Sequence, residues 1–366
     1  MLTAEQQEQF SALLRSALAG EYALVIDARS EREYAEDHIP GAINLPVLHD
    51  DEYAMIGTLH RSDTHSAYLR GVRLALANIA VALEDRVAEL PRSTRILVYC
   101  FRGGKRSKLW TDALSTIGYK TQRLEGGWKA YRNHVRAELA RLPAALTFNV
   151  LCGPTGCGKT RLLAALARAG AQVLDLEAIA RHRGSLIGDL PGVAQPAQKL
   201  FDSLLLDALQ RFDPEQPIWA EAESKKIGAI SVPEALVAQL HAGRVFRVET
   251  PMAARVRLWR EDYGHFERDP ASLLSRLQHL RPLVGGEEYA LWQSLAESRD
   301  IAQLFERLMT HHYDRAYARS IDAHYADYAS APAIELADLS AAGLDSVARA
   351  LIDAAMRDVV VKARHL

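Results

Sequence analysis

One cysteine of this chain stands at the end of an apolar run and directly before a loop rich in glycine and arginine. A thiol acts as a nucleophile when it is a thiolate, and positive charge and inward-pointing backbone N–H groups favour that form. The residues placed to do this for Cys100 are Arg102, Gly103, Gly104 and Arg106. We therefore predict that Cys100 is a nucleophile in an anion-binding loop. By spacing alone, a cysteine followed six residues later by an arginine also fits a phosphatase.

A second anion-binding pattern begins 53 residues after Cys100. Residues 153–160, Gly-Pro-Thr-Gly-Cys-Gly-Lys-Thr, fit the pattern G-x-x-x-x-G-K-T in full, after a strand-like run and before a helical one. Backbone N–H groups of such a loop hold two adjacent phosphates, the lysine neutralises them, and the threonine can ligate Mg²⁺. The expected phosphate-binding residues are Gly153, Gly156, Gly158, Lys159 and Thr160. Cys157 is predicted to be inert, so only the first site has a nucleophile.

Acidic and basic residues follow the strands predicted after this loop. A magnesium-dependent nucleotide site usually adds an acid at the end of a neighbouring strand. The acidic candidates are Asp175, Glu177, Glu221 and Glu223, and each would equally serve as a solvated strand end or a helix cap. The candidates for contacts with diphosphate or with the RNA backbone are Arg181, His182, Arg183, Ser185, Lys225 and Lys226. These residues would also fit an ordinary charged surface, and the sequence leaves both interpretations open.

The charges are segregated along the chain. The formal net charge is −2, but residues 92–141 contain 12 Lys/Arg and 3 Asp/Glu. Because this basic stretch includes the Cys100 loop, we predict an anionic partner that contacts Arg132 and Arg136; a solvated helical face is the alternative. Trp128 or Tyr131 would receive a nucleic-acid base that has left its stack, although core packing is the favoured role for both.

Length and composition narrow the class of protein. A chain of 366 residues exceeds one ordinary core and predicts two domains. The three cysteines match neither a zinc site nor a disulfide framework, which favours a reducing compartment. The N-terminus lacks a basic start followed by an apolar run, and no run of about 18 apolar residues occurs. We expect a cytoplasmic protein without a membrane partner.

Short apolar runs alternate with helical patterns, which predicts parallel sheets covered by helices. The strands expected in the first part are residues 23–27, 42–45, 96–100 and 121–124. Those expected in the second part are residues 146–151, 172–175, 217–221, 244–248 and 333–336, with helices over 252–330. We place the domain boundary at Leu142-Pro143, giving domains 1–142, which ends in a basic joining helix, and 143–366.

Three segments, two before the Cys100 loop and one after it, resemble the successive signatures of rhodanese domains and occur in the same order. They are VIDARSEREY at 25–34, HIPGAINLP at 38–46 and EGGWKAYR at 125–132. The resemblance covers about residues 10–138 and implies that Cys100 receives a chalcogen atom and passes it on. Asp27 and Arg29 are expected to support the loop through hydrogen bonds and ion pairs rather than to do chemistry.

A rhodanese-like domain followed by a P-loop NTPase-like α/β domain with a helical C-terminal region resembles the tRNA 2-selenouridine synthase family. Further motifs that are similar are Asp175-Leu-Glu, His182-Arg-Gly-Ser and Glu221-Ala-Glu-Ser-Lys-Lys-Ile-Gly. The resemblance implies replacement of sulfur by selenium in the thiolated wobble uridine of tRNAs for Lys, Glu and Gln. It implies an S-geranylated intermediate, geranyl diphosphate and selenophosphate as co-substrates, and Cys100 as a perselenide carrier.

Several points stay open at this level. The P-loop would hold either geranyl diphosphate or a nucleotide, with or without Mg²⁺. The selenophosphate-producing enzyme is a candidate partner besides tRNA. Two alternative functions are a rhodanese-type persulfide sulfurtransferase fused to an ATP-dependent kinase, and a nucleotide-sensing adaptor that binds tRNA.

Overall fold

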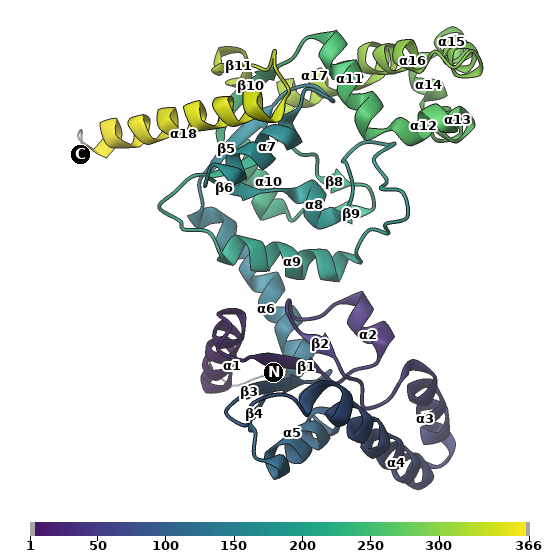
Figure 1. Cartoon of the computed structure of the whole chain (residues 1–366), viewed down its shortest axis with the longest axis vertical. Helices are drawn as coiled ribbons and strands as arrows, with labels where there is room; N and C mark the ends of the chain where they lie inside the picture. The colour runs from purple at the N-terminus through teal and green to yellow at the C-terminus, as the bar shows by residue number, and fades with distance from the viewer. Residues whose placement is uncertain (1–3, 364–366) are drawn as a thin grey trace. The chain divides into compact units, whose positions relative to one another are not determined.

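The computed structural model describes residues 4–363, which form two compact units (Figure 1). The first unit comprises the chain up to Leu139 together with Pro196–Asp207, and the second comprises Ala140–Gln195 and the chain from Ala208 onward. Both units combine a parallel sheet with helices, so the predicted α/β class is confirmed.

The sheet of the first unit has four parallel strands in the order β2-β1-β3-β4. Their bounds are β1 Leu24–Asp27, β2 Ile43–Asn44, β3 Arg95–Tyr99 and β4 Lys120–Arg123. All four strands were predicted from the sequence. Asp27, the last residue of β1, pairs with Tyr99, the last residue of β3, so the loops after these two strands start side by side. That edge of the sheet is where Cys100 follows β3.

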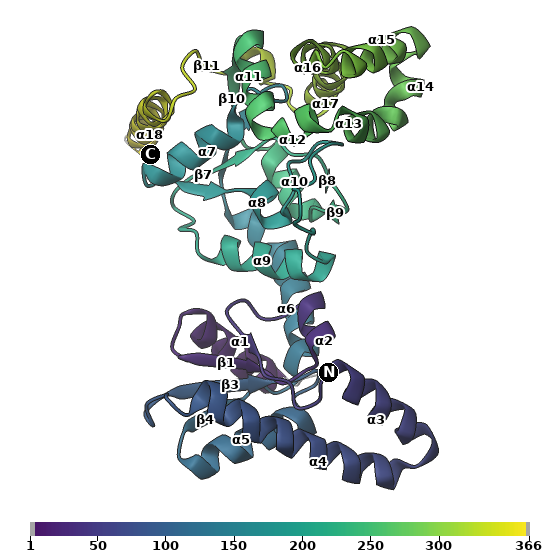
Figure 2. The same cartoon turned by 45° about the vertical axis from the view of Figure 1, so that its right-hand side comes forward.

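Helices cover this sheet (Figures 1 and 2). Their bounds are α1 Ala4–Leu18, α2 Glu31–Glu36, α3 Asp50–Ser62, α4 Thr64–Ala82, α5 Lys105–Ile117 and α6 Gly127–Arg141. Of these, α3, α4 and α5 share one hydrophobic core with the strands of the sheet. The core includes Ile26 and Val98 from the strands and Trp110 from α5, none of which is exposed. Helix α6 has its N-terminus beside the Cys100 loop.

One helix of the first unit comes from the second half of the sequence. Most of α9, Gln198–Gln210, clusters with residues 1–139, although it lies well beyond the predicted boundary at 142. Two hydrogen bonds join it to the first unit: Ser203 donates to Asp37, and Asp202 accepts from Arg132. A boundary placed at Leu142 therefore leaves out a piece of the first unit.

The sheet of the second unit has five parallel strands in the order β11-β10-β5-β7-β6. Their bounds are β5 Phe148–Cys152, β6 Gln172–Leu174, β7 Ile218–Glu221, β10 Arg244–Glu249 and β11 Ala333–Glu335. All five were predicted, whereas the short hairpin of β8 Lys226–Ile227 and β9 Ile230–Ser231 was not. The chain runs to one side of β5 first and to the other side later, and such a switch point places a ligand at the carboxyl ends of the strands.

The helices of the second unit fall into two groups. Around the sheet lie α7 Lys159–Arg168, α8 Leu176–Ala180, α10 Glu234–His241 and α18 Ala341–Ala363. The segment of the sequence between β10 and β11 forms a group of helices with its own core around Trp259, Trp292 and Phe305 (Figure 2). Its main members are α11 Met252–Asp262, α12 Gly264–Arg268, α13 Pro270–Leu277, α14 Arg281–Val284, α15 Gly286–Glu297, α16 Ile301–Leu308, the π-helical turn η4 Met309–Tyr313 and α17 Asp314–His324. The predicted helical region 252–330 is confirmed.

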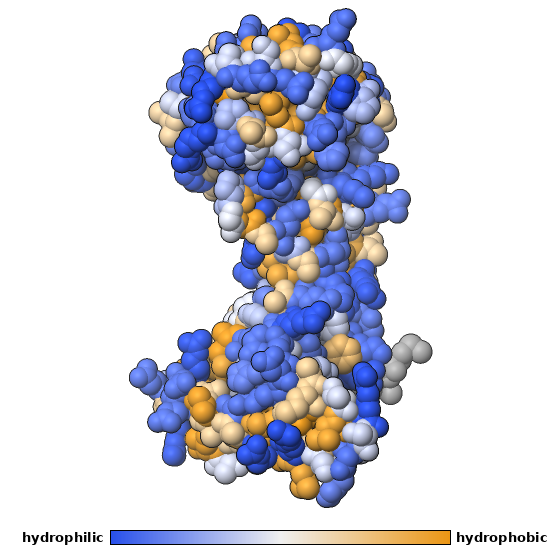
Figure 3. Space-filling view, turned by 90° about the vertical axis from the view of Figure 1, so that its right-hand side faces the viewer, coloured by the Kyte–Doolittle hydropathy of each residue, from blue (hydrophilic) through white to orange (hydrophobic). Residues whose placement is uncertain are grey.

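Helix α4 and the turn after it, Thr64–Val87, are long and apolar enough to span a membrane, which holds for no other helix within residues 4–363. One such helix is weak evidence for a membrane segment. Ala75 and Ile79 of α4 pack in the core of the first unit, while Leu69 and Leu76 are exposed. Figure 3 shows hydrophobic side chains on the surface of the first unit, in the lower part of the view.

Candidate functional site

The Cys100 loop is fixed by close contact with the start of α6. The N–H groups of Trp128 and Lys129 donate 2.9 Å hydrogen bonds to the carbonyls of Cys100 and Phe101. Gly127 has a φ of +53°, and a Cβ on it would lie 2.1 Å from the Cys100 carbonyl oxygen. Gly103, with a φ of +67°, would likewise place a Cβ 2.6 Å from the Leu124 carbonyl oxygen. Only glycine fits at these two positions. The next residue of the loop, Gly104, is the N-cap of α5.

The sulfur of Cys100 is nearly covered, with 3% of the residue exposed. Its Sγ lies 3.3 Å from the Ser107 hydroxyl at the first turn of α5, where backbone N–H groups are free of helical partners. Arg106 makes a 2.5 Å ion pair with Glu33 of α2. Burial lowers the pKa of Arg106, but Glu33 and Cys100 together raise it above its usual value. Arg102 is exposed, so it is free to meet an incoming anion.

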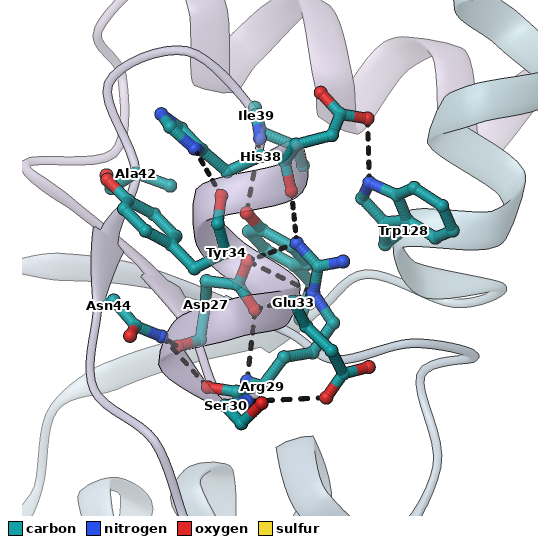
Figure 4. A network of polar contacts seen from close by, with 12 residues as sticks. Asp27, Arg29, Ser30, Glu33, Tyr34, His38, Ile39, Ala42, Asn44 and Trp128 are labelled. Atoms are coloured by element: carbon teal, nitrogen blue, oxygen red, sulfur yellow. Dashed lines mark hydrogen bonds and ion pairs between the residues drawn. The ribbon is translucent and has the colours of Figure 1, made fainter. Parts of the chain in front are cut away.

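Asp27 and Arg29 form a buried pair behind this loop (Figure 4). The Arg29 guanidinium donates to both carboxylate oxygens of Asp27, with Nη2 2.6 Å from Oδ2, and also donates to the Asp37 carbonyl at 2.6 Å. Asn44 donates to the Asp27 and Arg29 carbonyls. Neither charged side chain reaches solvent, which fits a role in supporting the loop. His38 stacks on Tyr34 in the same network.

A second buried polar cluster joins α6 and α9. The Asp37 carboxylate accepts hydrogen bonds from Trp128 Nε1 at 2.8 Å and from Ser203 Oγ at 2.7 Å. Arg132 lies 3.5 Å from the same carboxylate and makes a 2.8 Å ion pair with Asp202. Burial raises the pKa of Asp37 to about 6, against the opposing effect of these partners.

This cluster corrects one expectation about tRNA. Arg132 is 4% exposed, and its guanidinium forms an ion pair with Asp202. It is therefore not placed to contact an RNA phosphate. Trp128 and Tyr131 are 9% and 1% exposed, so both side chains pack inside the protein. This is the core-packing role that the sequence favoured for them. Arg136, one turn further along α6, is exposed.

The P-loop of the second unit runs from the end of β5 into α7. Gly156 and Gly158 have φ values of +78° and +90°, and Gly158 is the N-cap of α7. Lys159 Nζ donates to the Gly153 carbonyl at 2.7 Å. Burial lowers the pKa of Lys159, but the charges of Cys157 and nearby glutamates raise it above its usual value. Cys157 is fully buried and burial raises the pKa of its thiol, as expected for an inert cysteine.

Three of the four acidic candidates converge beside Lys159. A Cβ on Gly184 would lie 2.6 Å from Oε1 of Glu177 and 3.4 Å from Oε1 of Glu223, so these two carboxylates face one point. Glu221, at the end of β7, is buried, and the Thr160 side chain lies near its carboxylate. Burial, together with the charge of neighbouring carboxylates, raises the pKa of all three glutamates. Asp175 is instead the N-cap of α8, where it accepts from the Ala178 N–H.

A pocket of about 870 Å³ extends from the P-loop. One end is polar and includes Lys159, Thr160 and the three glutamates. The lining also contains a group of aromatic and aliphatic side chains that was not predicted from the sequence. Its members are Leu258, Trp259, Tyr263, Tyr313, Tyr317, Ile321 and Tyr325. The spacing of four residues from Tyr313 to Tyr325 was the available signal, because it puts these side chains on one face of a helix.

The basic and polar candidates of the second unit separate into two sets. Arg183, Ser185 and Lys225 line the pocket, and Arg183 donates to the Asp262 carbonyl. Three others do not line it: Arg181, His182 and Lys226. His182 is buried, with Nε2 3.2 Å from Asp189, so it is not placed to bind a diphosphate; Arg181 and Lys226 are exposed.

The donor set beside the P-loop fits Mg²⁺ only in part. The described residues contain no group of three or more His, Cys, Asp or Glu side chains arranged as metal ligands. However, Oε1 of Glu221 is buried without a hydrogen-bond partner, and the Thr160 hydroxyl lies beside the same carboxylate. Mg²⁺ is commonly held by one or two protein ligands together with substrate phosphates. Thr160 and Glu221 would suffice for that mode.

Comparisons with known proteins cover both units. The profile of the rhodanese-like domain matches residues 8–134, and that of the tRNA 2-selenouridine synthase AAA domain matches residues 146–332. A tRNA 2-selenouridine synthase of Hydrogenovibrio crunogenus is 30% identical over 321 residues, 80% of this chain and 88% of the relative. The enzymes of that name from Nitrosomonas europaea and Bdellovibrio bacteriovorus are 33% and 34% identical, each over 65% of this chain.

The aligned parts span 63% and 64% of the Nitrosomonas and Bdellovibrio relatives, slightly less than two thirds of their lengths. The match to the rhodanese-like domain includes the Cys100 loop, and the match to the AAA domain includes the residues that line the P-loop pocket. This chain therefore matches both domain families, one after the other, and a relative of that name matches 80% of its length. The chain belongs to the tRNA 2-selenouridine synthase family.

Proposed function

We propose that this chain replaces sulfur by selenium at position 2 of the thiolated wobble uridine in tRNAs for Lys, Glu and Gln. The reaction has two steps, geranylation of the sulfur from geranyl diphosphate and displacement of the geranylated sulfur by selenium from selenophosphate. The P-loop pocket performs the first step, and Cys100 carries the selenium for the second as a perselenide. Family membership supports the overall reaction, and the pocket supports the first step.

The observation that carries the proposal is the mixed lining of the pocket. A diphosphate needs N–H donors and a cation, which the loop around Lys159 offers. A ten-carbon prenyl chain needs apolar surface, which Leu258, Tyr317 and Ile321 offer in the same cavity. A nucleotide would use the phosphate end equally well, but it would present a polar sugar to this surface.

The chemistry explains why a prenyl donor and a selenium donor belong to one protein. The thiocarbonyl sulfur of the base attacks C1 of geranyl diphosphate, the C1–O bond breaks, and diphosphate leaves with the electron pair while the N3 proton passes to solvent. The alkylated sulfur is then a good leaving group. The outer selenium of the Cys100 perselenide attacks C2 and expels geranyl thiolate, and two equivalents of a small thiol then reduce the S–Se bond, leaving 2-selenouridine, free Cys100 and a disulfide. Because selenophosphate carries selenium at the selenide level, loading of Cys100 consumes one such disulfide as the two-electron oxidant, and phosphate leaves. Mg²⁺ held by Thr160 and Glu221 would neutralise charge on the diphosphate.

The partners follow from the same scheme. tRNA supplies the thiolated base, and exposed basic residues such as Arg102 and Arg136 are suited to its phosphates. An enzyme that produces selenophosphate would be a further partner, and the cytoplasm, where tRNA resides, would be the location. A persulfide sulfurtransferase joined to a kinase remains the alternative function, because rhodanese-type loops also carry sulfur.

Mass spectrometry of tRNA nucleosides tests the proposal. The protein is incubated with 2-thiolated tRNA, geranyl diphosphate and selenophosphate, and each co-substrate is left out in turn. We expect S-geranyl-2-thiouridine without selenophosphate and 2-selenouridine with both. Hydrolysis of ATP with no change in the nucleoside would favour the sulfurtransferase–kinase alternative.

A further inference from the structure

One aromatic ring of the pocket wall lies over the P-loop lysine. The ring centroid of Tyr317, on α17, is 5.7 Å from Lys159 Nζ. Among the described residues, no other ring is in such a position over this ammonium group. A cation within about 6 Å of an aromatic face is attracted by the ring quadrupole. The face of Tyr317 therefore already stabilises positive charge at the phosphate end of the pocket.

The Tyr317 hydroxyl is buried behind its ring, without a hydrogen-bond partner in the described part of the chain. The hydroxyl lies near Cys152 and Gly153, at the end of β5, and burial raises the pKa of this tyrosine above its ordinary value. The phenol is thus neutral, and its hydroxyl points toward the strand end while its ring lines the cavity. The ring rather than the hydroxyl is what a ligand in the pocket meets.

Geranyl transfer creates positive charge at this end of the pocket. When the C1–O bond of geranyl diphosphate lengthens, the electron pair moves to the diphosphate and positive charge appears on the allylic carbons C1 and C3. The P-loop and Lys159 hold the diphosphate, so C1, one bond away from it, comes next to Lys159. This is the place that the Tyr317 ring covers.

We propose that the face of the Tyr317 ring stabilises the allylic cation that develops on the geranyl group, an inference that rests on the proposed function. The C–S bond to the thiocarbonyl sulfur forms as the C1–O bond breaks, diphosphate leaves with both electrons, and the N3 proton of the base passes to solvent. Glu221 and Glu223 line the same pocket, but burial raises the pKa of both, so the ring face rather than a carboxylate charge is assigned this role. Tyr317 is a catalytic residue in this scheme, because the proposal puts its ring in contact with the reacting carbon.

Two substitutions separate the ring from its hydroxyl. Tyr317→Phe keeps the aromatic face, and Tyr317→Leu replaces it with an aliphatic side chain. Because cation–π contacts contribute up to about 2 kcal/mol, or roughly 30-fold, we expect kcat for geranyl transfer to fall by about 10- to 30-fold in the Leu variant. The Phe variant should stay within about threefold of the wild type, and KM for geranyl diphosphate should change little in either.

The matched control is Tyr328→Leu, a tyrosine outside the pocket lining, which should leave transfer unchanged. Inorganic diphosphate binding shows whether each variant keeps an intact P-loop. A Leu variant with wild-type kcat, or a Phe variant as slow as the Leu variant, overturns the role of the ring. A loss confined to KM overturns it as well, because it shows ground-state binding only.

A fluorinated donor tests the cation directly. Fluorine at C2 withdraws electrons from the allylic system, so the wild type should transfer the 2-fluorogeranyl group at least about tenfold more slowly, and an undiminished rate contradicts the inference. Failure of the proposed function is a different result: the wild type would then transfer no geranyl group from the natural donor at all.

Discussion

The hydroxyl of Ser203 donates a 2.7 Å hydrogen bond to the buried carboxylate of Asp37, although the two residues are 166 positions apart. Asp37 lies in the loop after α2, and Ser203 lies on α9, in a segment flanked on both sides by residues of the second unit. Neither side chain is exposed. The contact makes α9 a structural part of the rhodanese-like unit.

Asp37 should make stability depend on pH. Its pKa in the folded protein, about 6, is above its ordinary value because the carboxylate is buried. Asp37 therefore contributes stability that is fully present when the pH is below the pKa of this group in the unfolded chain. This contribution is lost as the pH rises through about 6, the pKa in the folded protein. Ionisation should therefore destabilise the wild type by about 1.4 kcal/mol between pH 5 and 7 relative to Asp37→Asn. Urea unfolding of both proteins at the two pH values measures this, and parallel profiles would contradict it.

Gly127→Ala should displace the Cys100 loop. The added Cβ would lie 2.1 Å from the Cys100 carbonyl oxygen, and the φ of +53° adds backbone strain of about 1–2 kcal/mol. A loop shift of about 1 Å can cost roughly 100-fold in rate, so selenation should fall by that order. Gly118→Ala is the matched control, since Gly118 also has a positive φ but has open space around it. Equal selenation by the two variants would show that the contact does not position the loop.

The strands and both anion-binding loops were predictable from the sequence because each depends on local pattern. The runs that became β3 and β5 are apolar and short, and each leads directly into its glycine loop. The burial of Arg132 was not predictable, since it depends on Asp202 and Ser203, about 70 residues away. A charged residue in a basic helix has the same local sequence whether it faces solvent or a distant acid.

In the P-loop pocket, too, some features follow from the local sequence and others depend on contacts with distant residues. The residues of the loop itself follow a known pattern, whereas the aromatic and aliphatic lining comes mainly from α11 and α17, which pack with other helices far from the loop in the sequence. Tyr317 and Ile321 look like ordinary helix core residues in the sequence. Their position over the loop appears only when the helical group between β10 and β11 has folded.

Arg136→Glu should weaken tRNA binding. Arg136 is exposed on α6 within the basic stretch, and a lost phosphate contact should reduce the slope of log affinity against log salt by about 1. The rate of Cys100 alkylation by iodoacetamide should not change. Arg61→Glu, an exposed position on α3 outside that stretch, is the control. Equal salt slopes in wild type and Arg136→Glu would place the tRNA elsewhere.

Lys159→Ala should weaken the binding of inorganic diphosphate. Losing a charge-assisted contact typically costs about 1.5–3 kcal/mol, which corresponds to a rise in Kd of roughly 10- to 100-fold. Lys226→Ala, an exposed lysine outside the pocket, should bind within about threefold of the wild type. Isothermal titration calorimetry compares the three proteins, and an unchanged Kd for Lys159→Ala would place the diphosphate in another site.

The division of labour between the two loops is tested most directly by nucleoside analysis of Cys100→Ser. An alcohol cannot carry a perselenide, while the pocket that holds Lys159 lies in the other unit and keeps all of its residues. With thiolated tRNA, geranyl diphosphate and selenophosphate present, the variant should accumulate S-geranyl-2-thiouridine and form no 2-selenouridine. Formation of 2-selenouridine at the wild-type level would contradict the account, because selenium would then reach the base without Cys100.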